Sequence, residues 1–466
     1  MSSSRFSMVF GPLLLGAAVL VSACAVSSDA AEQETSRPPN VVLFMADDLG
    51  WGDIGLNGAD LIDTPNIDRL GMEGIQLTEF YAGANVCTPS RAALLTGRYA
   101  NRSGMQHVIY PFSQRGLPRS EVTVAELLRD AGYATAMVGK WHLGHGAEHW
   151  PTEHGFDRFY GVAYSNDMEP FDLYRGSEII QSPADQAQLT ANYAAEAADF
   201  IAENADGPFF LYIAETFPHI PLFISNEFEG RSEAGLYGDV VEAMDAGIGE
   251  VLDALEVAGI ADDTLVIITS DNGPWFEGDA GPLRSRKGEM HEGGFRVPFV
   301  ARWPRGLPAG QVRDGMAMQI DLMPTLAALA GANVPGDRTI DGRDILPLMR
   351  GEGSTPHDVL FFMDGNDVVA VRDERFRLSL QTFYRTFRVP FERFGEPVLY
   401  DLSVDPRERF SFNREHPDAV KRLMRHVTAM REDLEGTETE PDNPFAPRDP
   451  DAPVGPRLGG PDTPSQ

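Results

Sequence analysis

The sequence predicts a doubly wound α/β fold with a mostly parallel sheet, followed by a smaller α+β subdomain. Three observations predict it. Four near-continuous apolar runs each end abruptly in polar residues, which is typical of strands buried on both faces of a parallel sheet. Segments with helical apolar spacing separate these runs. Beyond about residue 344 the pattern changes to short alternating runs.

The four predicted strands place polar side chains at their carboxyl ends. The runs are residues 39–50, 132–144, 207–221 and 263–273. The polar residues at their ends are, in chain order, Asp47 and Asp48, Lys140 and His142, His219, and Asp271 and Asn272. Doubly wound sheets bind ligands at the carboxyl edge of their strands. We therefore expect these side chains to converge although they lie far apart in sequence.

Helices are predicted between the strands. "TVAELLRDAG" begins at Thr123 with Glu126 three residues later and ends at Gly132, which is a capping-box start and a glycine stop. Residues 187–205, 237–259 and 320–331 show helical apolar spacing.

The C-terminal part has a different organisation. Residues 357–382 and 396–409 read as strands with turns, and residues 418–436 read as an amphipathic helix ended by glycine. We expect an α/β domain over residues 38–345 and an α+β subdomain over residues 346–436. Prolines recur with a period of three from Pro441, so residues 437–466 are predicted to form a disordered, Pro- and Asp-rich tail.

The N-terminus predicts export. Residues 8–21, "MVFGPLLLGAAVLV", have the length of a signal-peptide core and are short for a membrane span. They lead into "VSAC", which resembles a bacterial lipobox. We expect a lipoprotein signal peptide over residues 1–23, a lipid anchor at Cys24, a tether over residues 24–37, and a periplasmic or outer-membrane destination. The alternative is later cleavage to a soluble secreted protein.

The overall charge excludes one class of partner. The chain carries 38 basic and 70 acidic residues, a formal net charge of −32. The phosphates of a nucleic acid would be repelled by such a surface, so we expect no nucleic-acid partner. An anionic substrate would need a local basic pocket.

Two acidic pairs predict a cation site. Asp47 with Asp48, and Asp271 with Asn272, supply oxygen ligands from two strand ends. Such ligands suit Ca²⁺ or Mg²⁺, and no Cys or His set has zinc spacing. Either pair alone is common turn chemistry, but two pairs at one sheet edge favour a metal. Asp53 and Asp279 are interpreted as surface turns.

A cationic group is predicted at the same edge. It comprises Lys140, His142, His219 and Lys287. His219 lies between prolines in "PHIP", which restrict the backbone that carries the imidazole. The alternative for "LRSRKGEMHEGG", which contains Lys287, is a solvated basic loop.

The second cysteine, Cys87, opens "CTPSRAALLTGR". Pro89 and the alanines and leucines after it predict a helix that begins near Cys87. A helix N-terminus and Arg91, one turn on, would lower a thiol pKa from about 8.5. These residues alone allow either an inert buried thiol or a cysteine nucleophile.

These segments together resemble a known family. "CTPSRAALLTGR" is similar to the formylglycine signature of type I sulfatases, and "GYATAMVGKWH" to their second signature. "PHIP", "EGGFRVPFVARWP" and "LYDLSVDPRE" follow in the family's order. The bacterial arylsulfatase and N-acetylgalactosamine-6-sulfatase types look most similar. One departure is Arg286, which stands where the family often has glycine.

The resemblance implies an alkaline-phosphatase-like fold, a catalytic domain over residues 38–345, and hydrolysis of aryl or carbohydrate sulfate esters. It implies that a formylglycine-generating enzyme oxidises Cys87 to Cα-formylglycine, whose hydrate (a gem-diol) attacks sulfur. By matching positions, Asp47, Asp48, Asp271 and Asn272 would bind Ca²⁺, with Mg²⁺ possible. Arg91 and Lys140 would hold the formylglycine, and Lys140 would also touch sulfate. His142 would act as the base for sulfate release, and His219 and Lys287 would bind sulfate.

Two alternatives remain at this stage. Phosphonate monoester and phosphodiester hydrolases also use formylglycine, and their substrates carry the same single charge. A lipid-anchored protein that only binds sulfated glycans would need no modification of Cys87. The substrate, for which a sulfated polysaccharide is the expectation, would be selected by loops at residues 101–119, 164–178 and 383–394. Aromatic residues in these loops are Tyr110, Tyr164, Phe171, Tyr174 and Tyr384.

Overall fold

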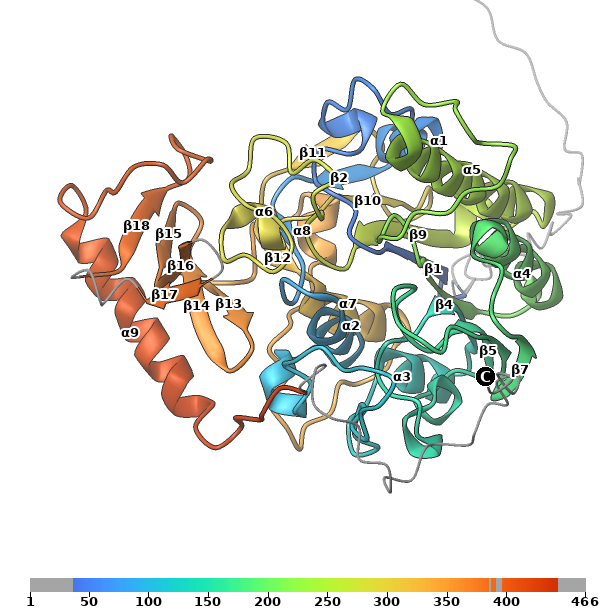
Figure 1. The fold of residues 1–466 in the computed structure, drawn as a ribbon, viewed down its shortest axis with the longest axis horizontal. Coiled ribbons are helices and arrows are strands. Elements are labelled where there is room, and N and C mark those ends of the chain that lie inside the picture. The colour runs from blue at the N-terminus through green and yellow to red at the C-terminus, as the bar shows by residue number, and fades with distance from the viewer. Residues whose placement is uncertain (1–36, 385–386, 391–395, 443–466) are drawn as a thin grey trace, which may run out of the picture. The chain divides into compact units, whose positions relative to one another are not determined.

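A computed structural model describes residues 37–384, 387–390 and 396–442 of the chain (Figure 1). The predicted signal peptide and Cys24 lie outside the described residues, as does most of the predicted tail. The described residues from 38 onward belong to one compact unit, and everything below concerns them. No helix within these described ranges is both long and apolar enough to cross a bilayer.

The unit is built on a ten-stranded sheet with the order β11-β2-β10-β9-β1-β8-β4-β5-β6-β7. Its five central strands run parallel. They are β9 (Thr264–Ser270), β1 (Asn40–Ala46), β8 (Phe209–Ala214), β4 (Ala134–Lys140) and β5 (Arg158–Val162). The outer strands are β11 (Gln311–Arg313), β2 (Ile75–Leu77), β10 (Phe299–Arg302), β6 (Leu173–Arg175) and β7 (Glu178–Gln181).

Helices cover both faces of this sheet, because alternate residues of each strand point to opposite sides. Val42 and Phe44 of β1 pack with one set of helices, whereas Leu43 and Met45 pack with the other. The first set is α1 (Pro65–Glu73), α4 (Leu189–Asn204) and α5 (Gly235–Val257). The second set is α2 (Cys87–Thr96), α3 (Val124–Asp130) and α7 (Leu322–Leu329).

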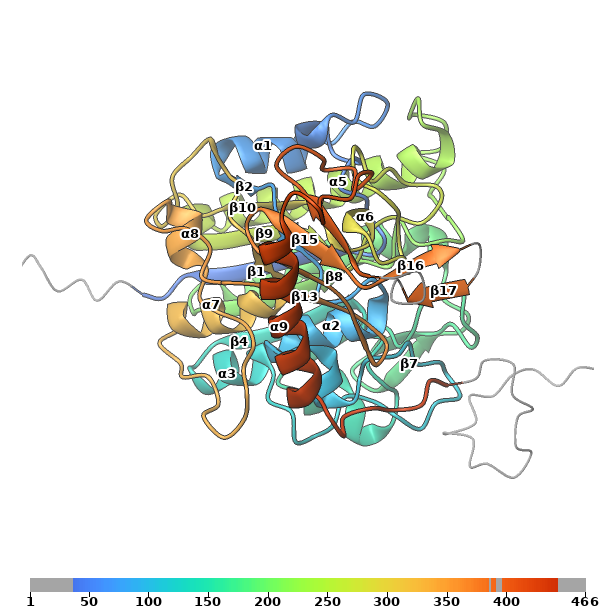
Figure 2. The same cartoon turned by 90° about the vertical axis from the view of Figure 1, so that its left-hand side faces the viewer.

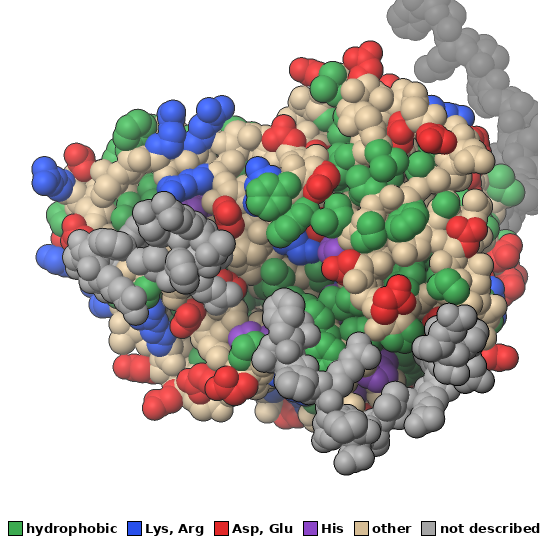
Figure 3. All heavy atoms as spheres, in the orientation of Figure 1, with side chains coloured by type: hydrophobic (Ala, Val, Ile, Leu, Met, Phe, Trp, Pro, Cys, Tyr) green, Lys and Arg blue, Asp and Glu red, His purple; other side chains and the backbone are tan. Residues whose placement is uncertain are grey.

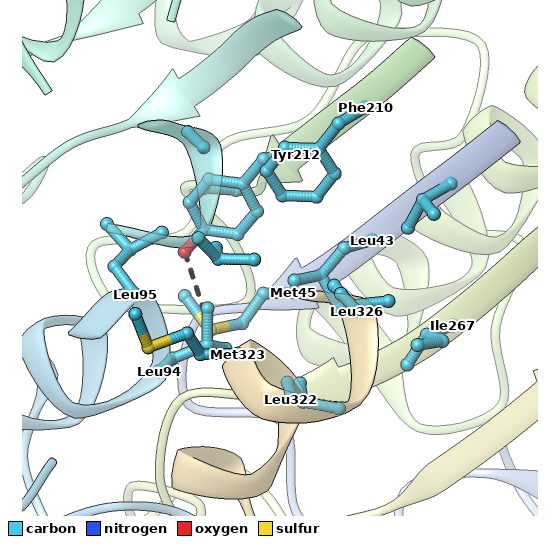
Figure 4. Close-up of a cluster of buried hydrophobic side chains, with 14 of the residues drawn as sticks. Leu43, Met45, Leu94, Leu95, Phe210, Tyr212, Ile267, Leu322, Met323 and Leu326 are labelled. Carbon is cyan, nitrogen blue, oxygen red and sulfur yellow. Dashed lines mark hydrogen bonds between the residues drawn. The ribbon is translucent and has the colours of Figure 1, made fainter. Parts of the chain in front are cut away.

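The packing of α2 holds the start of that helix against the sheet. Leu94 and Leu95 of α2 lie among Met45, Tyr212 and Met323, which come from β1, β8 and α7 (Figure 4). All five side chains are buried. Because this contact fixes the helix on the sheet, the first residue of α2 has a defined place near the end of β1.

A second, antiparallel sheet follows, with the order β13-β14-β15-β18. Its strands are β13 (Leu360–Asp364), β14 (Asp367–Arg372), β15 (Phe376–Ser379) and β18 (Val398–Asp401). Helix α9 (Pro417–Asp433) lies across this sheet (Figure 2) and packs Leu423 and Val427 into its core. The remaining elements are the helices α6 (Glu292–Phe295) and α8 (Leu346–Arg350) and the strand pairs β3 (Phe80–Tyr81) with β12 (Ala317–Met318) and β16 (Gln381–Tyr384) with β17 (Phe387–Pro390).

The predicted fold class is confirmed, since a mostly parallel sheet between helices precedes a smaller antiparallel sheet. Each predicted strand and helix is present, and Thr123 and Glu126 form the predicted capping box. The predicted domain boundaries stay predictions. The outer strands of the large sheet had no apolar run to reveal them.

Candidate active site

The predicted site residues meet at the carboxyl edge of the central sheet. Because β9, β1, β8 and β4 are parallel neighbours, their carboxyl ends lie side by side. Helix α2 and the loop after β9 reach the same edge. The residues brought together are Asp47, Asp48, Cys87, Arg91, Lys140, His142, His219, Asp271, Asn272 and Lys287, and all except the half-buried Lys287 are buried.

Asp47 lies at the centre of the group. Its carboxylate accepts a hydrogen bond from Lys140 Nζ and lies 3.5 Å from Cys87 Sγ and 3.6 Å from Arg91 Nη2. Burial opposes ionisation, but the surrounding cations, Lys140 first, outweigh it and hold the pKa of Asp47 well below its usual value. Asp47 is therefore a permanent anion.

The second acidic pair completes an oxygen-rich cluster. Asp271 Oδ1 accepts from the backbone N–H of Asp48 at 3.1 Å, and Asn272 Nδ2 donates to Asp48 Oδ1 at 2.7 Å. Burial and the nearby Asp47 raise the pKa of Asp271 to about 7. The carboxylates therefore repel one another in a site that is shielded from water.

These residues fit a hard divalent cation. Carboxylate and amide oxygens are the ligands that Ca²⁺ and Mg²⁺ prefer. Asn272 Oδ1 is buried and, within the described ranges, accepts no hydrogen bond, as expected for an atom reserved for a ligand. The ligand atoms of Asp47, Asp48, Cys87 and His219 lie within 4.8 Å of one another. The cluster thus extends from the carboxylates to the start of α2.

Cys87 is not an activated thiol. It is the first residue of α2, but burial and then the neighbouring Asp47 raise the pKa of its thiol. The expectation of a lowered pKa was wrong, because it counted the helix N-terminus and Arg91 but not burial beside a carboxylate. A thiolate nucleophile is therefore disfavoured.

Arg91 acts on the acidic residues rather than on the thiol. Its Nε and Nη2 donate to Asp271 Oδ2 at 3.1 and 2.8 Å, and its Nη1 donates to the backbone oxygen of Lys140 at 2.8 Å. It thereby connects α2 to the ends of β9 and β4. Ion pairing outweighs burial and raises the pKa of Arg91, which keeps it charged.

Lys287 and His219 lie close to the carboxylate of Asp48. Lys287 Nζ lies 2.7 Å from both carboxylate oxygens of Asp48, and His219 Nε2 lies 3.7 Å from Asp48 Oδ2. Burial and then Lys287 lower the pKa of His219. Three cationic side chains, Arg91, Lys140 and Lys287, thus balance three carboxylates. A bound divalent cation would leave the group net positive, which suits an anionic substrate.

His142 lies two residues after Lys140, just past the end of β4. Its Nε2 faces the backbone oxygen of Ile109 at 3.0 Å, and its buried Nδ1 has no hydrogen-bond partner among the described residues. Burial, then Lys140 and Arg91, lower its pKa well below 6.5. His142 is therefore neutral near pH 7 and could accept a proton from a bound group.

Two residues of the site were missed by the sequence analysis. Ser165 Oγ accepts from Lys140 Nζ at 3.0 Å and lies 3.4 Å from His219 Nε2. Asn166 Oδ1 lies 3.1 Å from His219 Nδ1. Both follow β5, and a Ser-Asn pair after a strand has no pattern that separates it from an ordinary turn.

Lys287 and Arg286 are neighbouring cations in one loop, and Lys287 is the one that faces the acidic cluster. Lys287 contacts Asp48, whereas the guanidinium of Arg286 lies over the ring of Phe276, with Cζ 4.5 Å from the centroid. Asp53, interpreted as a surface turn, is instead buried and accepts from Tyr237 Oη at 2.6 Å. Helix α5, which carries Tyr237, covers it.

The aromatic residues of the predicted substrate loops differ in exposure and packing. Tyr110 stacks on Phe112, which is exposed, at 5.3 Å between centroids. Tyr164 is buried and bonds His145 Nδ1 at 2.6 Å, and Phe171 lies in the core. The side chain of Tyr384 lies outside the described residues. Tyr174 packs edge-on against Trp150, with centroids 5.0 Å apart. Among the side chains that the structure describes in these loops, Tyr110 has the arrangement best suited to stacking on a substrate ring.

Comparison with known proteins gives consistent matches. The Sulfatase family model matches residues 39–332, and the model for the C-terminal part of N-sulphoglucosamine sulphohydrolase matches residues 285–433. Human arylsulfatase A is 40% identical over 431 residues, which cover 82% of this chain and 85% of that protein. Mouse N-acetylgalactosamine-6-sulfatase is 36% identical over 453 residues, covering 85% and 87%. The crystal structure of Ps i-CgsB in complex with k-i-k-neocarrahexaose has a TM-score of 0.76 and 28% identity, covering 86% of this chain and 94% of that one.

Proposed function

Because the chain belongs to the sulfatase family and is a sulfuric ester hydrolase, we propose that it hydrolyses aryl or carbohydrate sulfate esters through an oxidised Cys87. The observation that carries the proposal is the place of Cys87, whose Sγ lies 3.5 Å from Asp47 Oδ1 inside a closed cluster of charges. Its thiol is held protonated, so the residue needs modification to act. Cα-formylglycine at this position supplies a hydrated aldehyde, and so an oxygen nucleophile.

The chain's own residues bind and orient the sulfate. Lys140 and Lys287 present ammonium groups on the two sides of Asp47 and Asp48, and His219 is held between Ser165 and Asn166. Cations in a closed site stabilise the charge that moves onto the sulfate and leaving-group oxygens. Lys287 and His219 then assist departure of the alcohol.

His142 is proposed as the base for release of sulfate. It is neutral, because burial and two cations lower its pKa, and it lies beside Lys140 at the end of β4. Its Nδ1 is free to accept a proton. Arg91 holds Asp271 and the end of β4 in place, and thereby orients the first turn of α2.

The cation is proposed to be Ca²⁺, with Mg²⁺ as the second candidate, held by Asp47, Asp48, Asp271 and Asn272. The unpartnered Asn272 Oδ1 and the mutual repulsion of the carboxylates support it. These four residues would hold the ion beside the sulfate, where it would supply Lewis-acid chemistry and screening of negative charge.

Turnover of an aryl sulfate tests the function. The protein is produced together with a formylglycine-generating enzyme, and the tryptic peptide 70–91 is weighed to measure conversion of Cys87. Activity should scale with the converted fraction and be lost in Cys87→Ala. Full conversion without turnover of any aryl or sugar sulfate would contradict the proposal. An aryl phosphodiester assayed in parallel separates the sulfatase from a phosphodiesterase, and a preference for the diester would favour the latter.

We further propose a sulfated polysaccharide as the natural substrate and a lipid anchor at Cys24 in the periplasm or outer membrane. The first is supported by the likeness to the structure of Ps i-CgsB in complex with k-i-k-neocarrahexaose, and the second by "VSAC" at residues 21–24. Metabolic labelling with a radioactive fatty acid tests the anchor, since Cys24→Ser should carry no label. An unlabelled wild-type protein would contradict it.

A further inference from the structure

An exposed phenylalanine packs with a half-buried tryptophan and a guanidinium on the segments next to the site. Phe276 is 66% exposed, among the most exposed large apolar side chains described. Its ring lies under Arg286, with Cζ 4.5 Å from the centroid, and edge-on to Trp275, with centroids 4.9 Å apart. Arg286 Nη1 also donates to the backbone oxygen of Trp275 at 3.4 Å. These contacts hold the guanidinium in one place.

This group is attached directly to the catalytic cluster. Trp275 follows the cation-site residue Asn272 by three positions, and Arg286 precedes Lys287. The backbone N–H of Lys287 donates to the backbone oxygen of Pro274 at 2.9 Å, which ties the two segments together. Lys287 Nζ contacts Asp48. The aromatic pair and Arg286 are therefore tied to the segments that carry the charge cluster. Figure 3 shows basic and histidine side chains gathered near the middle of this face of the molecule.

Arg286 differs from most arginines of this acidic chain. It pairs with no carboxylate among the described residues, although 70 of the chain's residues are acidic. By contrast, the buried Arg91 and Arg377 are both in ion pairs. A half-buried guanidinium that is preorganised by an aromatic face and lacks an anion is suited to bind one.

We propose that Arg286, on its platform of Phe276 and Trp275, is a second anion subsite of the enzyme. It binds a sulfate or carboxylate that the substrate carries in addition to the ester being cleaved, while the aromatic side chains contact the adjoining ring. A guanidinium binds either oxyanion through two parallel hydrogen bonds. The inference rests on the proposed function and adds a substrate class: aryl or sugar sulfates with a second anionic group.

The test compares two aryl sulfates that differ only by an added ring carboxylate, together with a monosulfated and a disulfated saccharide. Arg286→Ala should lower kcat/KM for the doubly charged member of each pair by about tenfold and leave the singly charged member within about twofold. Arg286→Lys keeps the charge but not the paired donors, and should recover part of the loss. Phe276→Leu should give a smaller loss of the same selectivity, because the guanidinium loses its support.

Arg305→Ala is the matched control. Arg305 is an exposed arginine paired with Asp263, so its removal changes the net charge equally and should leave the selectivity unchanged. Equal losses on both members of each pair, or no loss, would overturn the subsite. The carboxylate and sulfate pairs show separately which oxyanion it accepts.

A failure of the proposed sulfatase function can be distinguished from a failure of the Arg286 subsite. If the wild type hydrolyses no sulfate ester, the same compounds are titrated by calorimetry into Cys87→Ala, with and without Arg286→Ala. The subsite predicts that the doubly charged compound alone binds about tenfold more weakly when Arg286 is absent. Identical affinities would reject it whatever the activity.

Discussion

Asn272 illustrates how the side chains of the site depend on one another. Its amide nitrogen donates to Asp48 Oδ1 at 2.7 Å, whereas its buried oxygen has no donor within the described residues. A buried oxygen that accepts no hydrogen bond costs on the order of 1–3 kcal/mol. A ligand bound to Asn272 Oδ1 would remove this cost, which accounts for an amide oxygen left unpaired beside three carboxylates.

Removal of a divalent cation should therefore destabilise the protein. Binding at a concentration of 100 times Kd stabilises a fold by about 2.7 kcal/mol, so melting curves with a chelator and with Ca²⁺ should differ by on the order of 3 °C. Asn272→Ala should shrink this difference, because one ligand is lost. A melting temperature that responds to neither Ca²⁺ nor Mg²⁺ would contradict the cation site.

His142 allows a prediction on the chemical step. His142→Ala should lower kcat by about 10²- to 10⁴-fold, the usual contribution of a positioned base, and KM should fall with it, because only the release of sulfate after ester cleavage is slowed. Because its pKa is lowered well below 6.5, the residue stays neutral as the pH falls through 6.5. The wild type should therefore show no loss of kcat centred at pH 6.5.

His145→Ala serves as the control for this measurement. His145 lies three residues further on and bonds Tyr164 Oη at 2.6 Å, outside the charge cluster, so its kcat should stay within about twofold of wild type. An equal loss in both variants would show that the segment, rather than the base, had been disturbed.

At the scale of elements, the antiparallel sheet holds the loop that carries Lys287. Arg377 of β15 pairs with Glu292 at 3.0 Å and with Glu408 at 3.1 Å, and donates to the backbone oxygen of Met290 at 2.6 Å. Glu408 in turn accepts from the backbone N–H of Glu292 at 2.8 Å. Helix α6 and the end of the Lys287 loop thus rest on residues of the C-terminal sheet.

Removal of the Arg377 side chain should lower the free energy of unfolding. Arg377→Met removes the guanidinium that pairs with both buried carboxylates and leaves them with their longer contacts, Glu292 with Arg296 at 3.5 Å and Glu408 with His291 at 3.3 Å. Removing one member of a buried pair costs about 3–5 kcal/mol. Urea unfolding should report that loss, and kcat/KM should fall as Lys287 loses its support. Arg375→Ala is the matched control, since Arg375 is half exposed where it pairs with Asp401 and its loss should lower the stability much less. Equal stability of the two variants would contradict the role of Arg377.

At the scale of the whole molecule, the four strands that carry most of the site were predictable, whereas the fifth parallel strand, β5, and the outer strands of the large sheet were not. Strand β1 and its neighbours β9, β8 and β4 are continuous apolar runs. The sequence therefore predicted that they are buried strands and that their carboxyl ends meet at one edge of the sheet. Strand β7 is largely exposed and carried no such pattern. Ser165 and Phe171 lie on connections whose path depends on contacts distant in sequence. The thiol of Cys87 was misjudged because its pKa depends on burial, which a local pattern does not contain.

The net charge of −32 makes a prediction that concerns the molecule as a whole. The exterior repels an anionic substrate before it reaches the basic pocket, and salt weakens this repulsion, since the Debye length falls from about 30 Å at 0.01 M to about 8 Å at 0.15 M. Thus kcat/KM for an aryl sulfate with a single charge should rise roughly two- to fivefold over this range of sodium chloride, with kcat unchanged. The steady-state rates are measured at both salt concentrations, with sucrose of matched viscosity as the control. A fall in kcat/KM would mean that Lys140, Lys287 and the bound cation already dominate the approach of the substrate, because salt then screens attraction instead of repulsion.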